Sequence, residues 1–299
     1  MNPSRILVIH RRSTYTETVS MGAFEPFRVM MNRRDPLVTN FIAAHDDHEK
    51  AMASIRRTLS DRNLNFTWRY DLVGIDPDQF DLVVTVGGDG TVLHASHSIG
   101  DTPVLAINSS PHTSVGYFTA GEAADFGEIL DKALDGSLVS TRLFRMEVRI
   151  NGEVVNNRVL NDVLFSHDCP ASTTRYLLAH GDREEEQMSS GVWISTATGS
   201  TAAIRAAGGK SMRAGSRRLQ FAVREPGPSG GALDLGRATL VRGFVRKQET
   251  LSIRSKTSAA RLYIDGPHVA VPVDFGDIVT FSGGLRPINL LGHRTQKNP

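Results

Sequence analysis

The chain has 299 residues, and its 34 Lys and Arg against 32 Asp and Glu give a formal net charge of +2. This near balance argues against nucleic-acid binding, which depends on a clustered basic surface. No run approaches the roughly 20 apolar residues of a membrane helix, and no signal segment opens the sequence. The single cysteine, Cys169, cannot form an intrachain disulfide. We therefore expect a soluble protein of the cytoplasm, with no nucleic-acid or membrane partner.

The first 140 residues combine short apolar runs with helical patterns. Nearly continuous apolar runs are typical of strands buried on both faces of a parallel sheet, and they occur at residues 6–9, 81–86 and 104–107. Apolar spacing predicts a helix over residues 48–59, and alternation predicts a strand over 64–70. Residues 122–134 predict a helix that ends before Gly136. This order is typical of an α/β domain with a parallel sheet.

Two segments lack a clear period. Residues 14–44 contain Pro26, Pro36 and scattered apolar residues that fit neither a helix nor a strand. A structureless loop of this length is unusual in a compact domain, so the structure of this segment stays open. The acidic run at residues 183–186 is interpreted as an exposed hairpin tip between strands.

The pattern changes near Ser140, where short β-branched or alternating runs replace helical periodicity. These runs occupy residues 143–150, 154–165, 174–180, 192–196, 239–245, 250–254, 261–264, 269–273 and 278–281. Many short strands separated by turns are typical of an all-β domain. Chains of this length usually form two domains, because single cores tend to split beyond roughly 250–300 residues. We therefore expect an α/β domain at 1–140 and an all-β domain at 141–284.

A glycine-rich loop follows the second apolar run and reads Gly87-Gly88-Asp89-Gly90-Thr91. Ligands of open α/β sheets bind at the carboxyl ends of the strands, where this loop is expected to lie. Glycines let the backbone approach phosphates and present N–H groups to them, and the carboxylate between them is free to reach a substrate hydroxyl. A tight turn with a helix-capping aspartate is the alternative interpretation.

A second glycine-containing element runs from an apolar strand into a stretch of small residues. It reads Ser195-Thr196-Ala197-Thr198-Gly199-Ser200-Thr201-Ala202-Ala203. Hydroxyls and backbone amides at a helix start form a good anion or ribose site, whereas an ordinary capped helix is the alternative. The element is not a Walker loop, because Ile204 stands where the first glycine of that motif would precede Gly209.

Asn161 and Asp162 interrupt an otherwise apolar β run. Adjacent strand residues point to opposite faces, so at least one of the two polar side chains faces a sheet interior or a cleft, unless the pair marks a strand edge or a bulge. Two histidine-containing features are also open to more than one interpretation. The acidic and histidine cluster at residues 45–49 fits a solvated helix start better than a metal site, and His94 either packs on a helix face or contacts substrate.

In their order and spacing, these three elements resemble the motifs of the NAD kinase family. Residues 115–118 read Val-Gly-Tyr-Phe where the family often has Leu-Gly-Phe, and Asp265-Gly266 extends a match that covers roughly residues 6–291. The first loop alone is shared with lipid kinases and phosphofructokinases, whereas the full set is specific. Ser189-Ser190-Gly191 and the segments 166–171, 206–209 and 218–226 are most similar to the plant NADH kinase-like branch.

The resemblance implies a fold and a reaction. The fold is an α/β domain joined to a β-sandwich-like domain, with the dinucleotide in the cleft between them and residues from about 285 to 299 returning to the first domain. Asp89 would accept the proton of the adenosine-ribose 2′-hydroxyl as it attacks the γ-phosphoryl of ATP, with Mg²⁺ or another divalent cation on the phosphates. Family members assemble as homodimers or homotetramers.

The resemblance also implies the residues that bind substrate. Asn161 and Asp162 would hold the ribose and the base, and the glycine-loop amides would hold the phosphates. The remaining implied contacts are Gly87, Gly88, Gly90, Thr91, His94, Ser190, Thr198, Gly199, Ser200, Thr201, Ala202 and Ala206. No side chain is expected to form a dedicated metal site.

Three positions depart from the usual family pattern. Asp162 replaces a glutamate, Ser190 replaces an aspartate, and Ala203 replaces a frequent tyrosine. These changes leave two rival interpretations, a lipid or sugar kinase that uses the glycine loop on another hydroxyl, and a dinucleotide-binding module without activity. An assay for NADP formation distinguishes all three.

Overall fold

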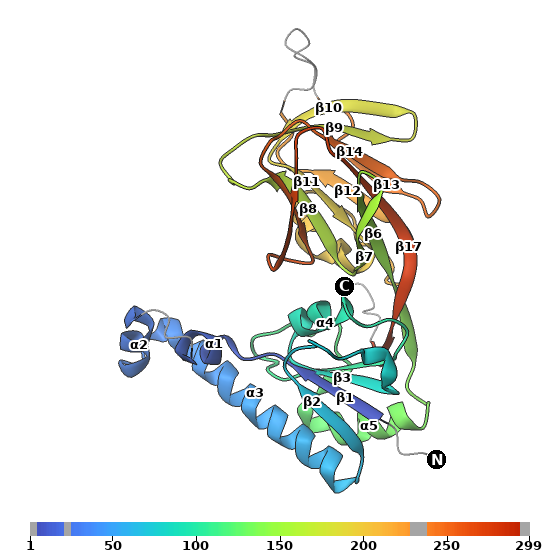
Figure 1. The fold of residues 1–299 in the computed structure, drawn as a ribbon. Coiled ribbons are helices and arrows are strands. Elements are labelled where there is room, and N and C mark those ends of the chain that lie inside the picture. The colour runs from blue at the N-terminus through green and yellow to red at the C-terminus, as the bar shows by residue number, and fades with distance from the viewer. Residues whose placement is uncertain (1–4, 21–24, 228–237, 294–299) are drawn as a thin grey trace. The chain divides into compact units, whose positions relative to one another are not determined.

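The computed structural model describes residues 5–20, 25–227 and 238–293. The chain divides into two compact units (Figure 1). Unit 1 comprises Met1–Thr141 together with Ile288–Pro299, and unit 2 comprises Arg142–Pro287. No helix within the described ranges is long and apolar enough to cross a membrane.

Unit 1 contains a parallel sheet in the order β17-β4-β3-β1-β2, with β5 beside β4. Its strands are β1 (Arg5–His10), β2 (Asn65–Arg69), β3 (Leu82–Val86), β4 (Val104–Asn108), β5 (Gly121–Glu122) and the last residues of β17 (Ile278–Leu291). Each of the pairings in this sheet is parallel. The apolar runs that predicted the strands are buried along β3 and β4, as expected for a sheet covered on both faces. The predicted α/β class is confirmed.

Helix α3 (Pro36–Asp61) accounts for part of the segment that sequence patterns left open. The Asp35 side chain caps it by accepting from the Leu37 N–H at 2.9 Å, and Pro36 occupies the first turn, where its fixed φ favours a helix. The predicted helix over 48–59 is the second half of α3. Residues 14–44 otherwise form α1 (Thr14–Ser20) and α2 (Glu25–Asn32).

Two further helices connect the strands of unit 1. Helix α4 (Asp89–Ser96) begins directly after β3, and the predicted helix over 122–134 is a short 3₁₀ turn, η2 (Ala123–Asp125), followed by α5 (Phe126–Leu134). Gly136 follows α5 with a φ of 79°, a left-handed conformation that glycine adopts without strain. Another 3₁₀ turn, η1 (Pro77–Gln79), precedes β3.

Unit 2 is built from β strands in two layers (Figure 1). The six-stranded antiparallel layer contains, in order, β13 (Arg242–Val245), β12 (Leu219–Val223), β11 (Val192–Ser195), β8 (Asp162–His167), β15 (Ala260–Ile264) and β16 (Val269–Val273). The other layer contains β10 (Arg183–Ser189), β9 (Thr174–His180), β14 (Leu251–Ser255), the first part of β17, β6 (Ser140–Ile150) and β7 (Glu153–Val159). The predicted all-β architecture of this part is confirmed.

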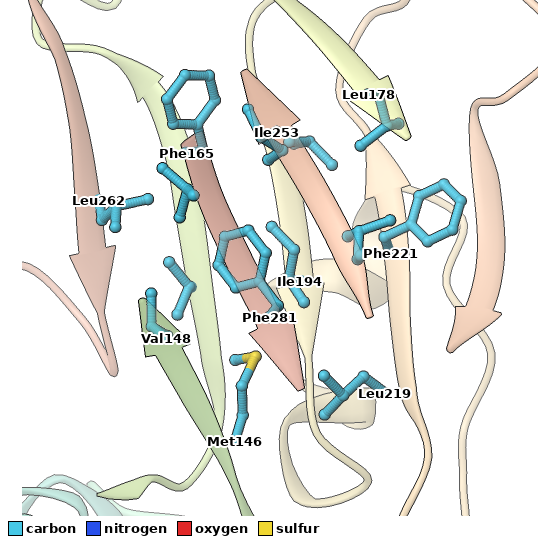
Figure 2. Packing of buried hydrophobic residues seen from close by; sticks show 14 of the residues in the cluster. Met146, Val148, Phe165, Leu178, Ile194, Leu219, Phe221, Ile253, Leu262 and Phe281 are labelled. Atoms are coloured by element: carbon cyan, nitrogen blue, oxygen red, sulfur yellow. The ribbon is translucent and has the colours of Figure 1, made fainter. Parts of the chain in front are cut away.

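The core of unit 2 lies between the two layers (Figure 2). Phe165 and Ile194 of the six-stranded layer face Ile253 and Phe281 of the other layer, and the exposed fraction of each is 0%. Burying a large apolar side chain stabilises a fold by roughly 1.5–3 kcal/mol. The alternating residues of both sheets therefore meet in one continuous core, as in a β-sandwich.

Two details of the strand predictions were wrong. The run at 154–165 is two strands, β7 and β8, because the chain turns at Leu160 and Asn161. The acidic run at 183–186 lies in β10 rather than at a hairpin tip. Its carboxylates have specific partners: Glu185 accepts from the N–H of Leu240 at 2.6 Å, and Glu186 pairs with Lys256. These interactions satisfy the carboxylates of Glu185 and Glu186, so β10 accommodates the two charged side chains.

Candidate functional site

The strand order of the unit 1 sheet reverses at β1, because β2 pairs with one edge of β1 and β3 pairs with the other. At such a switch point the connections after neighbouring strands leave toward opposite faces, and a crevice opens at the carboxyl ends. Gly87 and Gly88 follow β3 at this end of the sheet, and Asp89 begins α4. The fold thus places the glycine-rich loop where open α/β sheets bind ligands.

The Asp89 carboxylate is fixed by the loop between β4 and β5. One oxygen accepts from the Tyr117 N–H at 3.0 Å and the other from the Phe118 N–H at 2.9 Å. Each carboxylate oxygen has two lone pairs, so both retain capacity for a further hydrogen bond. Asp89 is half-buried, and this combination of fixed orientation and residual access is what a general base requires.

Two of the loop glycines are required because neighbouring side chains leave no space for a Cβ atom. A Cβ on Gly87 would lie 2.1 Å from the Thr91 Oγ1, and a Cβ on Gly88 would lie 2.4 Å from the Ser114 Oγ. Nothing lies within 4 Å of a Cβ built on Gly90, which is exposed. Gly87 and Gly88 therefore let the loop fold tightly, whereas Gly90 leaves open space beside the start of α4.

A cavity of about 330 Å³ is lined by the loop between β4 and β5, whose Tyr117 N–H binds Asp89. Its lining includes Asn108, Ser114, Gly116 and Tyr117. Asn108 is buried and holds the loop at two points, because its amide nitrogen donates to the Ser114 carbonyl at 3.1 Å and its amide oxygen accepts from the Ser110 N–H at 3.2 Å. The polar lining and the nearby Asp89 make this cavity a candidate for a nucleotide group.

Other predicted residues of this loop region differ in accessibility. Thr91 is buried in the first turn of α4, where its hydroxyl approaches the Gly87 position. His94 lies on the same helix and is exposed. The structure therefore places His94 on the helix that carries Asp89, without burying it in a core.

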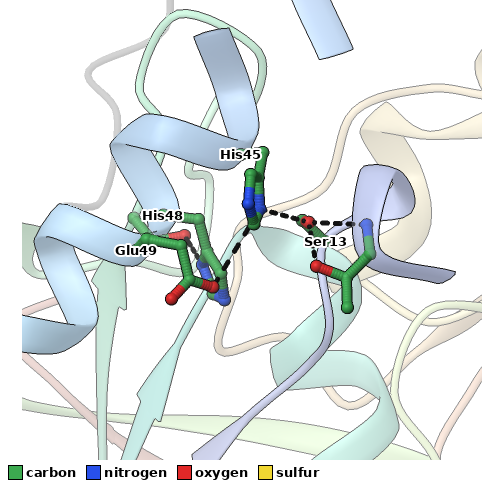
Figure 3. A network of polar contacts seen from close by, with 6 residues as sticks. Ser13, His45, His48 and Glu49 are labelled. Atoms are coloured by element: carbon green, nitrogen blue, oxygen red, sulfur yellow. Dashed lines mark hydrogen bonds and ion pairs between the residues drawn. The ribbon is translucent and has the colours of Figure 1, made fainter. Parts of the chain in front are cut away.

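The histidine cluster of α3 participates in hydrogen bonds with neighbouring side chains (Figure 3). His48 is buried and its Nδ1 lies 2.7 Å from the Ser109 Oγ, while the His45 Nδ1 lies 2.8 Å from the Ser13 Oγ and 4.0 Å from Glu49. No group of three metal-ligating side chains occurs within the described ranges. The cluster is helical, as expected, but the predicted helix start is wrong, because α3 begins at Pro36 and residues 45–49 lie within it; two members of the cluster also face protein partners instead of solvent.

In unit 2, Asn161 and Asp162 lie at a turn that one distant carboxylate holds. Asp265 accepts three backbone N–H groups, from Leu160 at 2.8 Å, from Asn161 at 2.7 Å and from Asp162 at 3.1 Å. Its own N–H donates to the Asp162 carbonyl at 2.9 Å. A carboxylate with three N–H donors is a strong local anchor. The turn that presents Asn161 and the start of β8 is therefore fixed by the residue that follows β15.

Asp162 is the most perturbed carboxyl group of this region. Its side chain is buried, and burial, reinforced by the negative charge of Asp265, raises the pKa of Asp162 to about 7. Strongly shifted carboxyl groups in clefts are frequent at functional sites, because they exchange protons near neutral pH. Asp162 is thus poised between its neutral and ionised forms at physiological pH.

The second glycine-containing element packs directly on this turn. Thr196 donates to the Leu160 carbonyl, and a Cβ on Gly199 would lie 2.3 Å from the Asn161 carbonyl oxygen. Two buried polar atoms here have no hydrogen-bond partner within the described ranges, the Asn161 Oδ1 and the Thr198 Oγ1. Buried polar groups normally have partners, so these two atoms are candidates to bind a ligand.

The element itself consists of η3 (Thr198–Thr201) and α6 (Ala203–Ala206). Ser200 has an internal role, since its hydroxyl donates to the Ala197 carbonyl at 2.6 Å and accepts from the Met212 N–H at 2.9 Å. Thr201, Ala202 and Ala206 are exposed. The structure therefore brings Asn161, Thr198 and Gly199 together and leaves the later residues accessible.

Ser190 lies in a separate cavity of about 150 Å³ in unit 2. Its lining includes His167, Asp168, Arg224 and Tyr263. The His167 Nδ1 lies 3.0 Å from the Asp168 carboxylate and also accepts from the Cys169 N–H. Sequence reasoning gave His167 no role, and the cavity now makes it a neighbour of Ser190.

Three residues near the candidate sites were missed as contributors. Asp265 was noted as part of a motif, but its three N–H contacts connect positions about a hundred residues apart, which sequence patterns do not show. Tyr117 and His293 lie beside Asp89 in unit 1, with their ring centroids 5.3 Å apart. His293 follows the last strand, β17. The expected return of the C-terminal segment to the first domain was the only sequence feature that could have indicated its place beside Asp89.

Three comparisons with known proteins agree with this geometry. Residues 15–138 match the family model of the ATP-NAD kinase N-terminal domain. A probable NADH kinase of Oryza sativa subsp. japonica is 36% identical over 239 residues, which cover 71% of this chain and 72% of that protein.

The fold is also similar to solved structures. A structure of yeast NADH kinase complexed with NADH gives a TM-score of 0.71 at 16% identity, covering 99% of this chain and 85% of that chain. A structure of an NAD kinase from Archaeoglobus fulgidus in complex with ATP gives a TM-score of 0.67 at 18% identity, covering 98% and 94%. At these identities the likeness shows the fold alone.

Proposed function

This chain belongs to the NAD kinase family, and from that premise we propose that it is an NAD(H) kinase. It transfers the γ-phosphoryl group of ATP to the 2′-hydroxyl on the adenosine ribose of NAD⁺, NADH or both. The observation that carries the proposal is the Asp89 carboxylate, held by two backbone N–H groups at the carboxyl end of β3. A lipid or sugar kinase shares the glycine loop but not the family membership.

Asp89 is the proposed base. It accepts the proton of the 2′-hydroxyl while the hydroxyl oxygen attacks the γ-phosphorus and ADP leaves. The amides beside Gly88 and Gly90 lie at the start of α4, where the helix dipole favours phosphate. ATP enters with Mg²⁺ or another divalent cation on its phosphates. Mg²⁺ bound in this way needs few protein ligands.

Unit 2 is the proposed dinucleotide-binding domain, over residues 141–284. The Asn161 Oδ1 and the Thr198 Oγ1 provide hydrogen-bonding atoms that have no partner among the described residues, and Asp162 provides a carboxyl group for ribose hydroxyls. Thr201, Ala202 and Ala206 add accessible surface on the same element, and Ser190 lines a separate cavity of this unit. The α/β domain is assigned to residues 1–140 together with the segment from about 285.

We further expect a homodimer or homotetramer, which a solution mass measured against the 32.6 kDa chain will reveal. The exposed free Cys169 fits a reducing compartment, the cytoplasm.

The test is NADP(H) formation from NAD⁺ and NADH, each with MgATP and with polyphosphate as donor. The Asp89→Asn variant should bind dinucleotide but turn it over about 10²–10⁴-fold more slowly, because the amide accepts no proton and its NH₂ group faces one of the two N–H donors without bonding it. Asp101→Asn, at an exposed position, is the control. Turnover of Asp89→Asn within a few-fold of wild type would remove Asp89 from the base role, and no product from wild type would leave a dinucleotide-binding module.

A further inference from the structure

Helix α3 buries one polar side chain among apolar ones. Four of its buried residues are apolar: Val38, Ala51, Ile55 and Leu59. The fifth is His48, whose exposed fraction is 6%. An apolar side chain would occupy this place without the cost of removing an imidazole from water. The histidine is therefore explained by the contact that it makes rather than by its volume.

His48 contacts the start of the loop between β4 and β5. Its Nδ1 lies 2.7 Å from the Oγ of Ser109, whose exposed fraction is also 6%. Burial lowers the pKa of His48, so the ring is neutral at pH 7. A neutral ring and a serine hydroxyl form this bond in either tautomer, because the hydroxyl both donates and accepts. The contact thus fixes one end of the loop to α3.

Hydrogen bonds within the loop connect the neighbours of Ser109 to its later residues. The amide nitrogen of Asn108 donates to the Ser114 carbonyl at 3.1 Å, and the Ser110 carbonyl accepts from the Ser114 N–H at 3.1 Å. The packing continues to Gly116, where a Cβ would lie 2.7 Å from the Asn108 amide nitrogen. A displacement of the first loop residues therefore also displaces Gly116.

The residues that follow Gly116 hold the proposed base. The N–H groups of Tyr117 and Phe118 donate to the two carboxylate oxygens of Asp89 at 3.0 Å and 2.9 Å. The His48 contact is thus one end of a continuous path of bonds, and the direction of the Asp89 carboxylate is set at its other end. Misplacing a reacting group by about 1 Å can slow an enzyme about 10²-fold.

We propose that His48 is a positioning residue, which orients Asp89 for turnover through Ser109 and the loop between β4 and β5. This inference rests on the proposed function, in which Asp89 is the base. The role requires no contact between His48 and substrate. It requires the hydrogen bond to Ser109.

Helix α3 also supplies a matched control, because it carries a second histidine–serine pair (Figure 3). The His45 Nδ1 lies 2.8 Å from the Oγ of Ser13, which immediately precedes α1. His45→Leu and Ser13→Ala therefore remove the same kind of bond from the same helix at a place outside the loop between β4 and β5.

The first experiment measures kcat and KM of folded His48→Leu, His48→Asn and Ser109→Ala. Without the bond, kcat should fall about 10-fold in His48→Leu and Ser109→Ala, while KM for either substrate changes less than about threefold. His48→Asn keeps a hydrogen-bonding atom close to the place of Nδ1, so it should recover most of the lost rate. The double variant His48→Leu/Ser109→Ala should be no slower than either single variant, since both remove one contact.

His45→Leu and Ser13→Ala should keep the wild-type kcat. Equal losses in these controls would assign the effect to a general weakening of α3 and overturn the proposal. Additive losses in the double variant, or equally slow His48→Leu and His48→Asn proteins, would do the same.

A second measurement needs no kinase activity. Hydrogen exchange of the Tyr117 and Phe118 N–H groups, followed by NMR, should be about 10-fold faster in His48→Leu and Ser109→Ala than in wild type, and unchanged in Ser13→Ala. Wild-type exchange in His48→Leu and Ser109→Ala would overturn the proposal. Absence of NADP(H) formation by wild type would instead contradict the proposed function.

Discussion

Asp162 gives the protein a predictable pH response at the scale of one residue. Its pKa is about 7 in the folded chain and near 3.8 when unfolded, because burial disfavours the ionised form. Between about pH 4 and pH 7 the folded state holds a proton that the unfolded state has released, so the free energy of unfolding falls as pH rises through this window. Above about pH 7 the loss is complete.

The change Asp162→Asn should remove this contribution, since the amide does not titrate. The midpoint of urea unfolding, measured at pH 5 and pH 8, should decline less in the variant than in wild type. Parallel declines in both proteins would assign the pH dependence to other groups. Asp168→Asn, with a carboxylate that is about two-fifths exposed, is a suitable comparison.

Ser190 bears on the choice between oxidised and reduced dinucleotide. Oxidised nicotinamide is a cation, and a carboxylate within a few ångströms would favour it by about 1 kcal/mol when partly desolvated. The resemblance to the family implies an aspartate at the position of Ser190, and Arg224 lines the same cavity. We therefore expect kcat/KM for NADH to be at least equal to that for NAD⁺.

Restoring the carboxylate tests this charge argument. Ser190→Asp should shift the ratio of the two kcat/KM values toward NAD⁺ by about fivefold, which corresponds to 1 kcal/mol, whereas the uncharged Ser190→Asn should leave the ratio unchanged. A strong NAD⁺ preference in wild type contradicts the prediction, and equal effects of the two variants contradict its mechanism.

At the scale of elements, the turn between β7 and β8 depends on the carboxylate of Asp265, which directly follows β15. In Asp265→Asn, the amide oxygen can still accept from Asn161 and Asp162, but its NH₂ group then faces the Leu160 N–H without an acceptor. Loss of that charged hydrogen bond should lower the free energy of unfolding by about 1–3 kcal/mol and raise KM for the dinucleotide.

A chemical denaturation curve and a KM measurement together test the role of this anchor. Asp274→Asn, at an exposed turn of the same unit, is the control. If Asp265→Asn lowers the free energy of unfolding but leaves KM for the dinucleotide unchanged, the Asp265 contacts stabilise the fold without positioning the binding site.

Elements whose signals are local in sequence were predicted well. Strand β3, the loop at Gly87 to Asp89 and the start of α4 are consecutive, so their apolar run and glycines were sufficient. The structure of the first half of α3 was left open because few of its residues are buried, so the apolar residues around Pro36 showed no clear period, although Asp35 supplies a cap. The anchoring by Asp265 was not predictable, because it joins residues 104 positions apart.

At the scale of the whole molecule, the last strand, β17, contributes to the stability of unit 1. Leu290 and Leu291 of β17 pair with Val104 and Leu105 of β4, and Leu290 is fully buried. Leu290→Ala should therefore destabilise unit 1 by about 2–5 kcal/mol, the usual range for a buried leucine.

Each unit carries one of the two tryptophans, Trp68 on β2 and Trp193 on β11. In a Trp193→Phe background, fluorescence should show an earlier unfolding transition when Leu290→Ala is added. In a Trp68→Phe background, the transition should move less. Leu134→Ala, at a partly exposed position of unit 1, is the control. Equal shifts from both tryptophans would show that the two units unfold together.

The return of β17 to unit 1 has a consequence for biosynthesis. A ribosome releases the strands β1 to β5 early, but β4 lacks the partner residues Leu290 and Leu291 until all of unit 2 has been translated. The edge of β4 that will pair with them is exposed during that interval, and exposed edges invite pairing with other chains. Unit 1 of the nascent protein therefore cannot complete its sheet until β17 has been translated. We expect unit 1 to depend more on chaperones during translation than unit 2 does.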